Sequence, residues 1–334
     1  MKRRAAALLC GLGALALLAC GTPPAPHPAE TVVAEPHWQD VFETVPELLV
    51  MVRAKAARED RVYGPLLRRA LQLARERSKA VAPTRTLEAM SDAEELVMGM
   101  RPDPVDSRGE RPELVLVALG VRTDIDPGTL TDDEGQTLWG PGPTGPVREL
   151  VRERDEHGHA IGASLFELPG RTWVIAEGDA RGRARDAFAH PLNRPAIDLD
   201  PRALAVVRID GPSLVNRVRA LQDLGGLASV GRHLRAMTLV LPPGADPSVR
   251  ATLAYDDDDS AALAKVALDE LVGAASRSGK RTSLTWLAWL SGAQVERLPR
   301  SVAVSAPLPP QLVDGLLKAG SAPLGVDPSE GDGG

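Results

Sequence analysis

The sequence predicts an α+β fold made of two similar halves, each with a mainly antiparallel sheet and with helices packed on one face of it. Short apolar runs come in pairs between helical segments, which favours this layering over a doubly wound parallel sheet. The pattern also restarts, because residues 203–208 follow Pro201 much as residues 48–53 follow Pro46. With 334 residues, the chain has the length of about two domains of roughly 150 residues each.

The first half opens with a short apolar run, residues 48–52, which is typical of a buried strand. Residues 63–79 place leucines and alanines at helical spacing and predict a helix. Ser91 with Glu94 forms a capping-box signature, so we expect a further helix from Ser91 to Met100. The remaining elements expected in this half are a strand at 114–119, a surface loop at 124–146, a hairpin of 147–154 with 160–168, a strand at 172–176 and a helix at 180–189.

The second half repeats the alternation of strands and helices. Its expected elements are a strand at 203–208, a helix at 212–224, strands at 237–241 and 249–255, a long helix from 260, a strand at 302–305 and a last helix at 310–318. These patterns predict a first domain at 41–195, a second at 196–320 and a disordered tail at 321–334, which is rich in Gly, Pro and acidic residues.

Residues 1–19 have the features of a cleaved secretion signal. Lys2, Arg3 and Arg4 form a basic region, and the apolar run that follows is too short to span a bilayer as a mature helix. The next four residues, Leu17-Leu18-Ala19-Cys20, resemble the lipobox of bacterial lipoprotein precursors. The resemblance implies that the signal is cut before Cys20 and that this cysteine carries the diacylglycerol and acyl chains. An ordinary signal peptide with a chance cysteine, or an uncleaved helical anchor, is the alternative.

A lipidated Cys20 predicts a protein held in the cell envelope, since two or three acyl chains anchor a protein firmly. In lipoproteins of this kind the residue after the cysteine directs sorting, and Gly21 implies the outer membrane, with the protein facing the periplasm. Residues 20–40 contain five prolines between Gly21 and Pro36 and predict an extended, disordered tether.

Composition narrows the classes of partner. Removal of residues 1–19 changes the formal charge from −6 to −9, and an acidic protein is a poor fit for nucleic acid or for electrostatic attachment to anionic lipid. Cys10 and Cys20 are the only cysteines, so the mature fold has no pair for a disulfide and no thiolate metal site. Ten aromatic residues are few for a pocket that stacks sugars or bases. We expect no cofactor.

Two polar clusters have a chemical and a structural interpretation. His157 and His159 flank Gly158 and could present two imidazoles to a metal, but the glycine favours a solvated hairpin tip. Asp256 to Asp259 could bind calcium through their carboxylates. The simpler interpretation is that they cap the helix that follows, because aspartate accepts hydrogen bonds from free amides and its charge suits the helix dipole.

Nucleotide-binding and hydrolase motifs are incomplete. Residues 279–282 (Gly-Lys-Arg-Thr) have the wrong spacing for a phosphate loop, and Arg281 replaces the hydroxyl residue that such a loop needs. Ser164 has Gly162 before it but Phe166 after it, so it does not form a nucleophile elbow. Asp124 and Asp126 begin like a calcium loop, but Gly135 stands where the bidentate glutamate belongs. The sequence therefore predicts no catalytic and no metal-binding residues.

Trp286 and Trp289 stand three residues apart in a segment that is apolar around much of its helical circumference. Such a helix usually belongs to the core, and a partner-binding face or a surface leaning on the membrane is the alternative. The sequence as a whole favours a non-enzymatic, membrane-anchored lipoprotein that binds a protein partner. A ligand- or solute-binding lipoprotein with an interdomain cleft is the second hypothesis, and an enzyme is the third.

Overall fold

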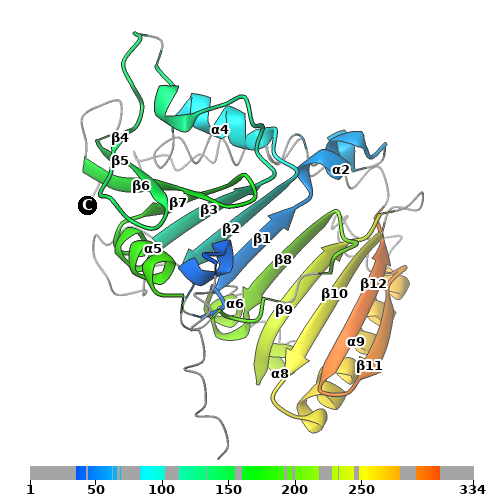
Figure 1. Cartoon of the computed structure of the whole chain (residues 1–334). Coiled ribbons are helices and arrows are strands. Elements are labelled where there is room, and N and C mark those ends of the chain that lie inside the picture. Colours follow the sequence, from blue (N-terminus) through cyan, green and yellow to red (C-terminus); the bar gives the residue numbers. More distant parts are fainter. Residues whose placement is uncertain are drawn as a thin grey trace, which may run out of the picture. The chain divides into compact units, whose positions relative to one another are not determined.

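The computed structural model describes residues 35–308, apart from residues 43, 62, 66–67, 69–82, 102–112, 133, 155–159, 192–193, 198–199, 218–227, 232, 244–247 and 279–290. The described residues from Pro36 onward belong to one compact unit. Figure 1 shows the described elements, in which an antiparallel sheet is combined with separate helices. The α+β class is therefore confirmed.

The described strands form one sheet of twelve, in the order β11-β12-β10-β9-β8-β1-β2-β3-β7-β6-β5-β4, and neighbouring strands are antiparallel. From the first half come β1 (Leu48–Val52), β2 (Glu95–Arg101), β3 (Glu113–Leu119), β4 (Gly140–Pro141), β5 (Arg148–Arg154), β6 (Ala160–Leu168) and β7 (Thr172–Glu177). From the second half come β8 (Ala205–Asp210), β9 (Leu234–Leu241), β10 (Ser248–Tyr255), β11 (Gln294–Leu298) and β12 (Ser301–Pro307).

The two predicted halves do not have separate sheets. β1 pairs with β8 in a register that places Val50 opposite Val207, so the first strands of the two halves join edge to edge. Joining them removes one free strand edge from each half, and a free edge can pair with another chain and cause aggregation. The predicted boundary near residue 195 therefore lies in a connection between strands of one shared sheet.

The described helices are α2 (Ala54–Glu59), α4 (Thr84–Ser91), α5 (Asp179–Ala189), α6 (Gly211–Arg217), α8 (Ala228–Gly231) and α9 (Asp258–Ser278), with two 3-10 turns, η1 (Trp38–Val41) and η2 (Pro127–Thr129). The prediction that helices pack on one face is wrong for the first half. η1 and α5 cover one face of its strands, and α4 covers the opposite face. Both faces are covered because β7, the strand Thr172–Glu177, is buried along its whole length and offers apolar residues on each side.

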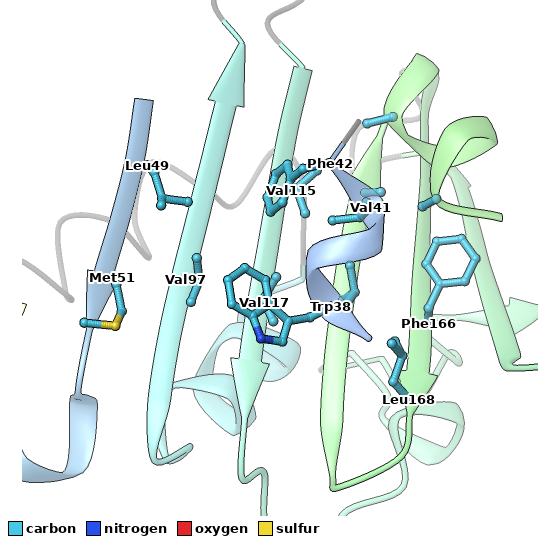
Figure 2. Packing of buried hydrophobic residues seen from close by; sticks show 14 of the residues in the cluster. Trp38, Val41, Phe42, Leu49, Met51, Val97, Val115, Val117, Phe166 and Leu168 are labelled. Atoms are coloured by element: carbon cyan, nitrogen blue, oxygen red, sulfur yellow. The ribbon is translucent and has the colours of Figure 1, made fainter. Parts of the chain in front are cut away.

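Figure 2 shows the core on the η1 side, where Trp38, Val41 and Phe42 lie over side chains of β1, β2 and β3. Trp38 and Phe42 meet edge to face, with ring centroids 6.3 Å apart. Gly99 on β2 leaves the space for this packing, since a Cβ atom there would lie 2.4 Å from the Phe42 ring.

The predicted tether, residues 20–40, is therefore wrong at its C-terminal end. Trp38 is buried in the core, and the carboxylate of Asp40 accepts two hydrogen bonds from Arg194, at 2.9 and 3.2 Å. A buried carboxylate needs such a partner to offset its desolvation. The folded part of the chain thus begins by His37, which caps η1 by accepting a hydrogen bond from the amide of Gln39.

The helix predicted from Ser91 to Met100 is also wrong. Ser91 is the last residue of α4, and its hydroxyl donates to the carbonyl of Leu87 at 2.6 Å instead of capping a new helix. The residues that follow form β2, which pairs with both β1 and β3. Pairing on both sides overrides the local capping signature, as tertiary context often does.

Candidate partner-binding surface

The second half ends in a unit that we call the open end: α9 together with the hairpin of β11 and β12. Figure 1 shows α9 behind β12 and β11, at the side of the sheet opposite to β4. The buried face of α9 is built from alanines, and Ala261, Ala264 and Ala275 are each 0% exposed. Small side chains let the helix axis approach the sheet closely. The cluster that Ala261 and Ala264 join includes Leu253, Tyr255 and Val302.

The N-terminus of α9 is fixed by the aspartates that precede and begin it. The Oδ1 atom of Asp257 accepts the amide of Ser260 at 2.7 Å, and this hydrogen bond holds the pKa of Asp257 below its usual value. Asp258 accepts the amide of Arg300 at 2.7 Å, while Asp256 forms an ion pair with Arg235. The helix-capping interpretation is therefore confirmed for Asp257, while the carboxylates of Asp256 and Asp258 bind Arg235 and the amide of Arg300.

Asp258 also joins α9 to the hairpin of β11 and β12. β11 and β12 are connected by Pro299 and Arg300, since Leu298 lies opposite Ser301. Arg300 has a φ of 50°, in the left-handed region that a tight turn requires here. Besides the bond from Arg300 to Asp258, the guanidinium of Arg297 donates to the main-chain oxygen of Asp258 at 3.2 Å. The start of α9 and the tip of the hairpin thus form one rigid corner.

Large apolar side chains are exposed at this end. Leu263 and Val266 on α9 are 61% and 56% exposed, and Leu298 on β11 is 38% exposed. Leu263 and Val266 are three residues apart and so lie on neighbouring positions of the helix surface. Of the residues that the structure describes, these are the large hydrophobic residues found to be exposed, and all belong to the open end.

β11 also presents a strand edge. Within the described sheet β11 is the last strand and pairs only with β12. In an antiparallel pair, every second residue of such a strand turns its N–H and C=O groups away from its neighbour. Gln294, Glu296, Arg297 and Leu298 are all exposed, so this edge is accessible.

The other edge of the sheet, which we call the closed end, comprises β4, β5 and the loop of residues 124–147. β4 has only two residues, and Pro141 lacks the N–H group that a further strand would need. Gly142 turns the chain back by donating its amide to the carbonyl of Glu149 at 2.9 Å. A Cβ atom at Gly142 would lie 2.6 Å from that carbonyl oxygen, so the turn requires glycine.

A buried carboxylate, paired with a partly exposed arginine, supports the closed end. Glu149 accepts hydrogen bonds from Arg185 of α5 at 2.6 and 2.8 Å and from the hydroxyl of Ser164 at 2.6 Å. Burial alone would raise the pKa of Glu149, but these hydrogen bonds outweigh burial and hold the pKa below its usual value. Ser164 is fully buried and serves as a structural donor to this carboxylate.

The closed end contains an open pocket of about 610 Å³ between the loop of residues 124–147 and β5, with Trp139 and Arg148 in its wall. Arg148 is engaged by Asp126 at 2.9 Å and by Glu167 at 2.8 Å. The amide of Gly128 and the guanidinium of Arg148 hold the pKa of Asp126 below its usual value. Because this pocket lies wholly within the first half, it is not the interdomain cleft that the ligand-binding hypothesis expects.

Several predicted positions fall outside the described residues. These are the lipidation site Cys20, the histidines His157 and His159, residues 279–282, and the tryptophans Trp286 and Trp289. Ser276, near the end of α9, donates to the main-chain oxygen of Ser291 at 3.4 Å, so Ser291 lies beside the end of this helix.

Sequence reasoning did not find β11 or the exposed positions on α9. The sequence signal that could have indicated β11 is the tight turn Pro299-Arg300, which lies between residues 294–298 and the apolar alternation of β12.

Across the ranges that the structure describes, no three His, Cys, Asp or Glu side chains gather as metal ligands would. No helix in those ranges combines the length and the apolar character needed to cross a bilayer.

No protein-family model and no curated protein matches the sequence. Among solved structures, a crystal structure of TP0453 (crystal form I) is similar, with 10% sequence identity and a TM-score of 0.45, over 87% of this chain and 99% of that chain. Similarity at this level carries no inference about function.

Proposed function

We propose that this chain is a membrane-anchored lipoprotein of the cell envelope whose folded part is a non-enzymatic binding module for a protein partner. The anchor is Cys20, at the end of the lipobox-like segment Leu17-Leu18-Ala19-Cys20. Gly21 favours the outer membrane, with the folded part facing the periplasm. The partner docks at the open end.

The observation that carries the binding role is the exposed apolar surface of α9, together with the edge of β11, which has no neighbour beyond it in the described sheet. Burying Leu263, Val266 and Leu298 against a partner would remove apolar area from water, which is favourable by about 25 cal/mol per Å². Exposed apolar side chains that cluster are typical of protein interaction sites, whereas single ones are common and need no explanation.

Acyl labelling tests the anchor. We expect wild-type protein to incorporate labelled palmitate and Cys20→Ser to lose the label and to accumulate as unprocessed or soluble chain. Cys10→Ser is the matched control and should keep the label. Palmitate that persists in Cys20→Ser would refute the assignment of the anchor.

Surface charge substitution tests the binding role. The double variant Leu263→Glu/Val266→Glu places two carboxylates on the open end, and Gln136→Glu/Thr144→Glu places two on the exposed closed end. After cross-linking in intact cells and solubilisation of the membranes, we expect one defined partner to be retained by wild type and by the closed-end variant. The open-end variant should lose it. Retention by the open-end variant, with loss in the closed-end variant, would move the interface to the other edge.

A further inference from the structure

On the basis of the proposed function, we propose that the outer edge of β11 binds an extended segment of the partner as a further antiparallel strand. The segment carries an acidic residue opposite Arg297 and a basic residue opposite Glu296. Its sequence therefore reads, from N- to C-terminus, apolar, acidic, basic, apolar, with the apolar residues opposite Leu298 and Val295.

The two edges of the sheet differ in their capacity to accept a strand. β4 ends the sheet with two residues and a proline, whereas β11 has five residues, none of them proline. Added strands are held by main-chain hydrogen bonds, which give affinity, while their alternate side chains give specificity. A five-residue edge offers enough of these groups to fix a register, and a two-residue edge does not.

The charges on β11 make the edge selective. Glu296 lies opposite Ala303 of β12, which in turn lies opposite Thr252 of β10, so the glutamate projects beside small side chains. Arg297 lies on the other face, where its hydrogen bond to the main-chain oxygen of Asp258 orients the guanidinium. Because this oxygen carries no formal charge, the contact does not neutralise the positive charge of Arg297. Opposite charges at directly paired positions stabilise a sheet, and like charges destabilise it.

The same charges disfavour a second copy of this chain as the occupant. Two β11 strands related by a two-fold axis over the whole strand would pair about Glu296. This register places Glu296 opposite the Glu296 of the other copy and Val295 opposite Arg297. A partner strand with acid and base in the stated order avoids both conflicts.

The test uses the full-length lipidated protein in detergent micelles and two labelled peptides of equal composition. One contains Val-Asp-Lys-Val between threonines and the other contains Val-Lys-Asp-Val. We expect the first peptide to bind wild-type protein at least about fivefold more tightly, as measured by fluorescence anisotropy. The reason is that the charge pairs at Arg297 and Glu296 are attractive with the first peptide and repulsive with the second. The swapped variant Glu296→Arg/Arg297→Glu should invert this preference. N-methylation of the alternate peptide amides that face β11 should abolish binding.

Three results would overturn strand addition at β11. They are equal binding of the two peptides or none, a preference that does not invert in the swapped variant, and a concentration-dependent dimer that the swapped variant abolishes. If one of these occurs while Leu263→Glu/Val266→Glu still loses the partner, the proposed function stands without the strand. If that variant keeps the partner, the proposed function itself fails.

Discussion

The two edges of the sheet differ in how much backbone they leave for a further strand to pair with. At the closed end, a two-residue strand, a proline and a turn that requires Gly142 leave little backbone for another strand to pair with. At the open end, four of the five residues of β11 are exposed, and the adjoining helix exposes Leu263 and Val266. Natural sheets usually blunt their edges, so an edge left accessible beside apolar surface is more typical of an interface than of a structural end.

The largest expected difference concerns stability. Trp139 at the closed end is 1% exposed and donates its indole N–H to the hydroxyl of Thr86 at 2.9 Å. Trp139→Ala should lower the free energy of unfolding by about 3–5 kcal/mol, measured by urea denaturation of the chain from residue 21. The matched change at the open end, Val266→Ala, should change it by no more than about 0.5 kcal/mol. A large loss in Val266→Ala would show that the α9 surface is covered within the chain.

A smaller effect is expected from the ion pair of the buried Glu149 with Arg185. Arg185→Leu leaves the Glu149 carboxylate buried with Ser164 as its remaining donor, which should cost about 1–3 kcal/mol of stability. Arg122→Leu is the control, because Arg122 and its partner Asp124 are both exposed and such pairs are worth about 0–1 kcal/mol. Equal losses in the two variants, again measured by urea denaturation, would show that the pairing of Glu149 does not stabilise the closed end more than an exposed ion pair does.

The pH dependence of unfolding gives a further test of this pair. The pKa of Glu149 is lower in the folded than in the unfolded chain, so its contribution to stability is present above the usual glutamate value of 4.5 and is lost as pH falls below it. Glu149→Gln should therefore be less stable than wild type at pH 7, and the difference should shrink as the pH falls from 4.5. A difference that grows on acidification would contradict the direction of the pKa shift.

The smallest effect on stability is expected at the open edge. Glu296→Thr/Arg297→Thr removes both charges from β11 while keeping residues suited to a strand, and the free energy of unfolding should change by no more than about 0.5 kcal/mol. Self-association should increase, because exposed charges discourage edge-to-edge pairing. Sedimentation velocity at rising concentration measures this. A variant that stays monomeric would indicate that the β11 edge is already covered.

Much of the secondary structure follows from the sequence. The short apolar runs became β1 and β3, the hairpin of β5 and β6 formed as its alternation predicts, and α9 begins where the aspartates indicate. These elements depend on local patterns that the chain carries within a few residues.

The rest depends on contacts between distant residues. The pairing of β1 with β8 joins Leu49 to Arg208 across the whole first half, and no local pattern specifies that register. β11 is polar because it is an edge, so it lacks the apolar alternation by which strands are recognised. Leu263 and Val266 look like core residues in the sequence, since α9 is apolar over most of its surface, and only the position of the helix on the sheet shows which side stays exposed.

The comparison of the two ends is tested most directly by site-specific photo-cross-linking in living cells. A photoreactive residue placed at position 266 or 298 of the anchored protein should yield the same cross-linked species of defined mass. At position 136, an exposed site on the closed end, that species should be absent. The same species formed from position 136, or formed there alone, would contradict the claim that the partner docks at the open end.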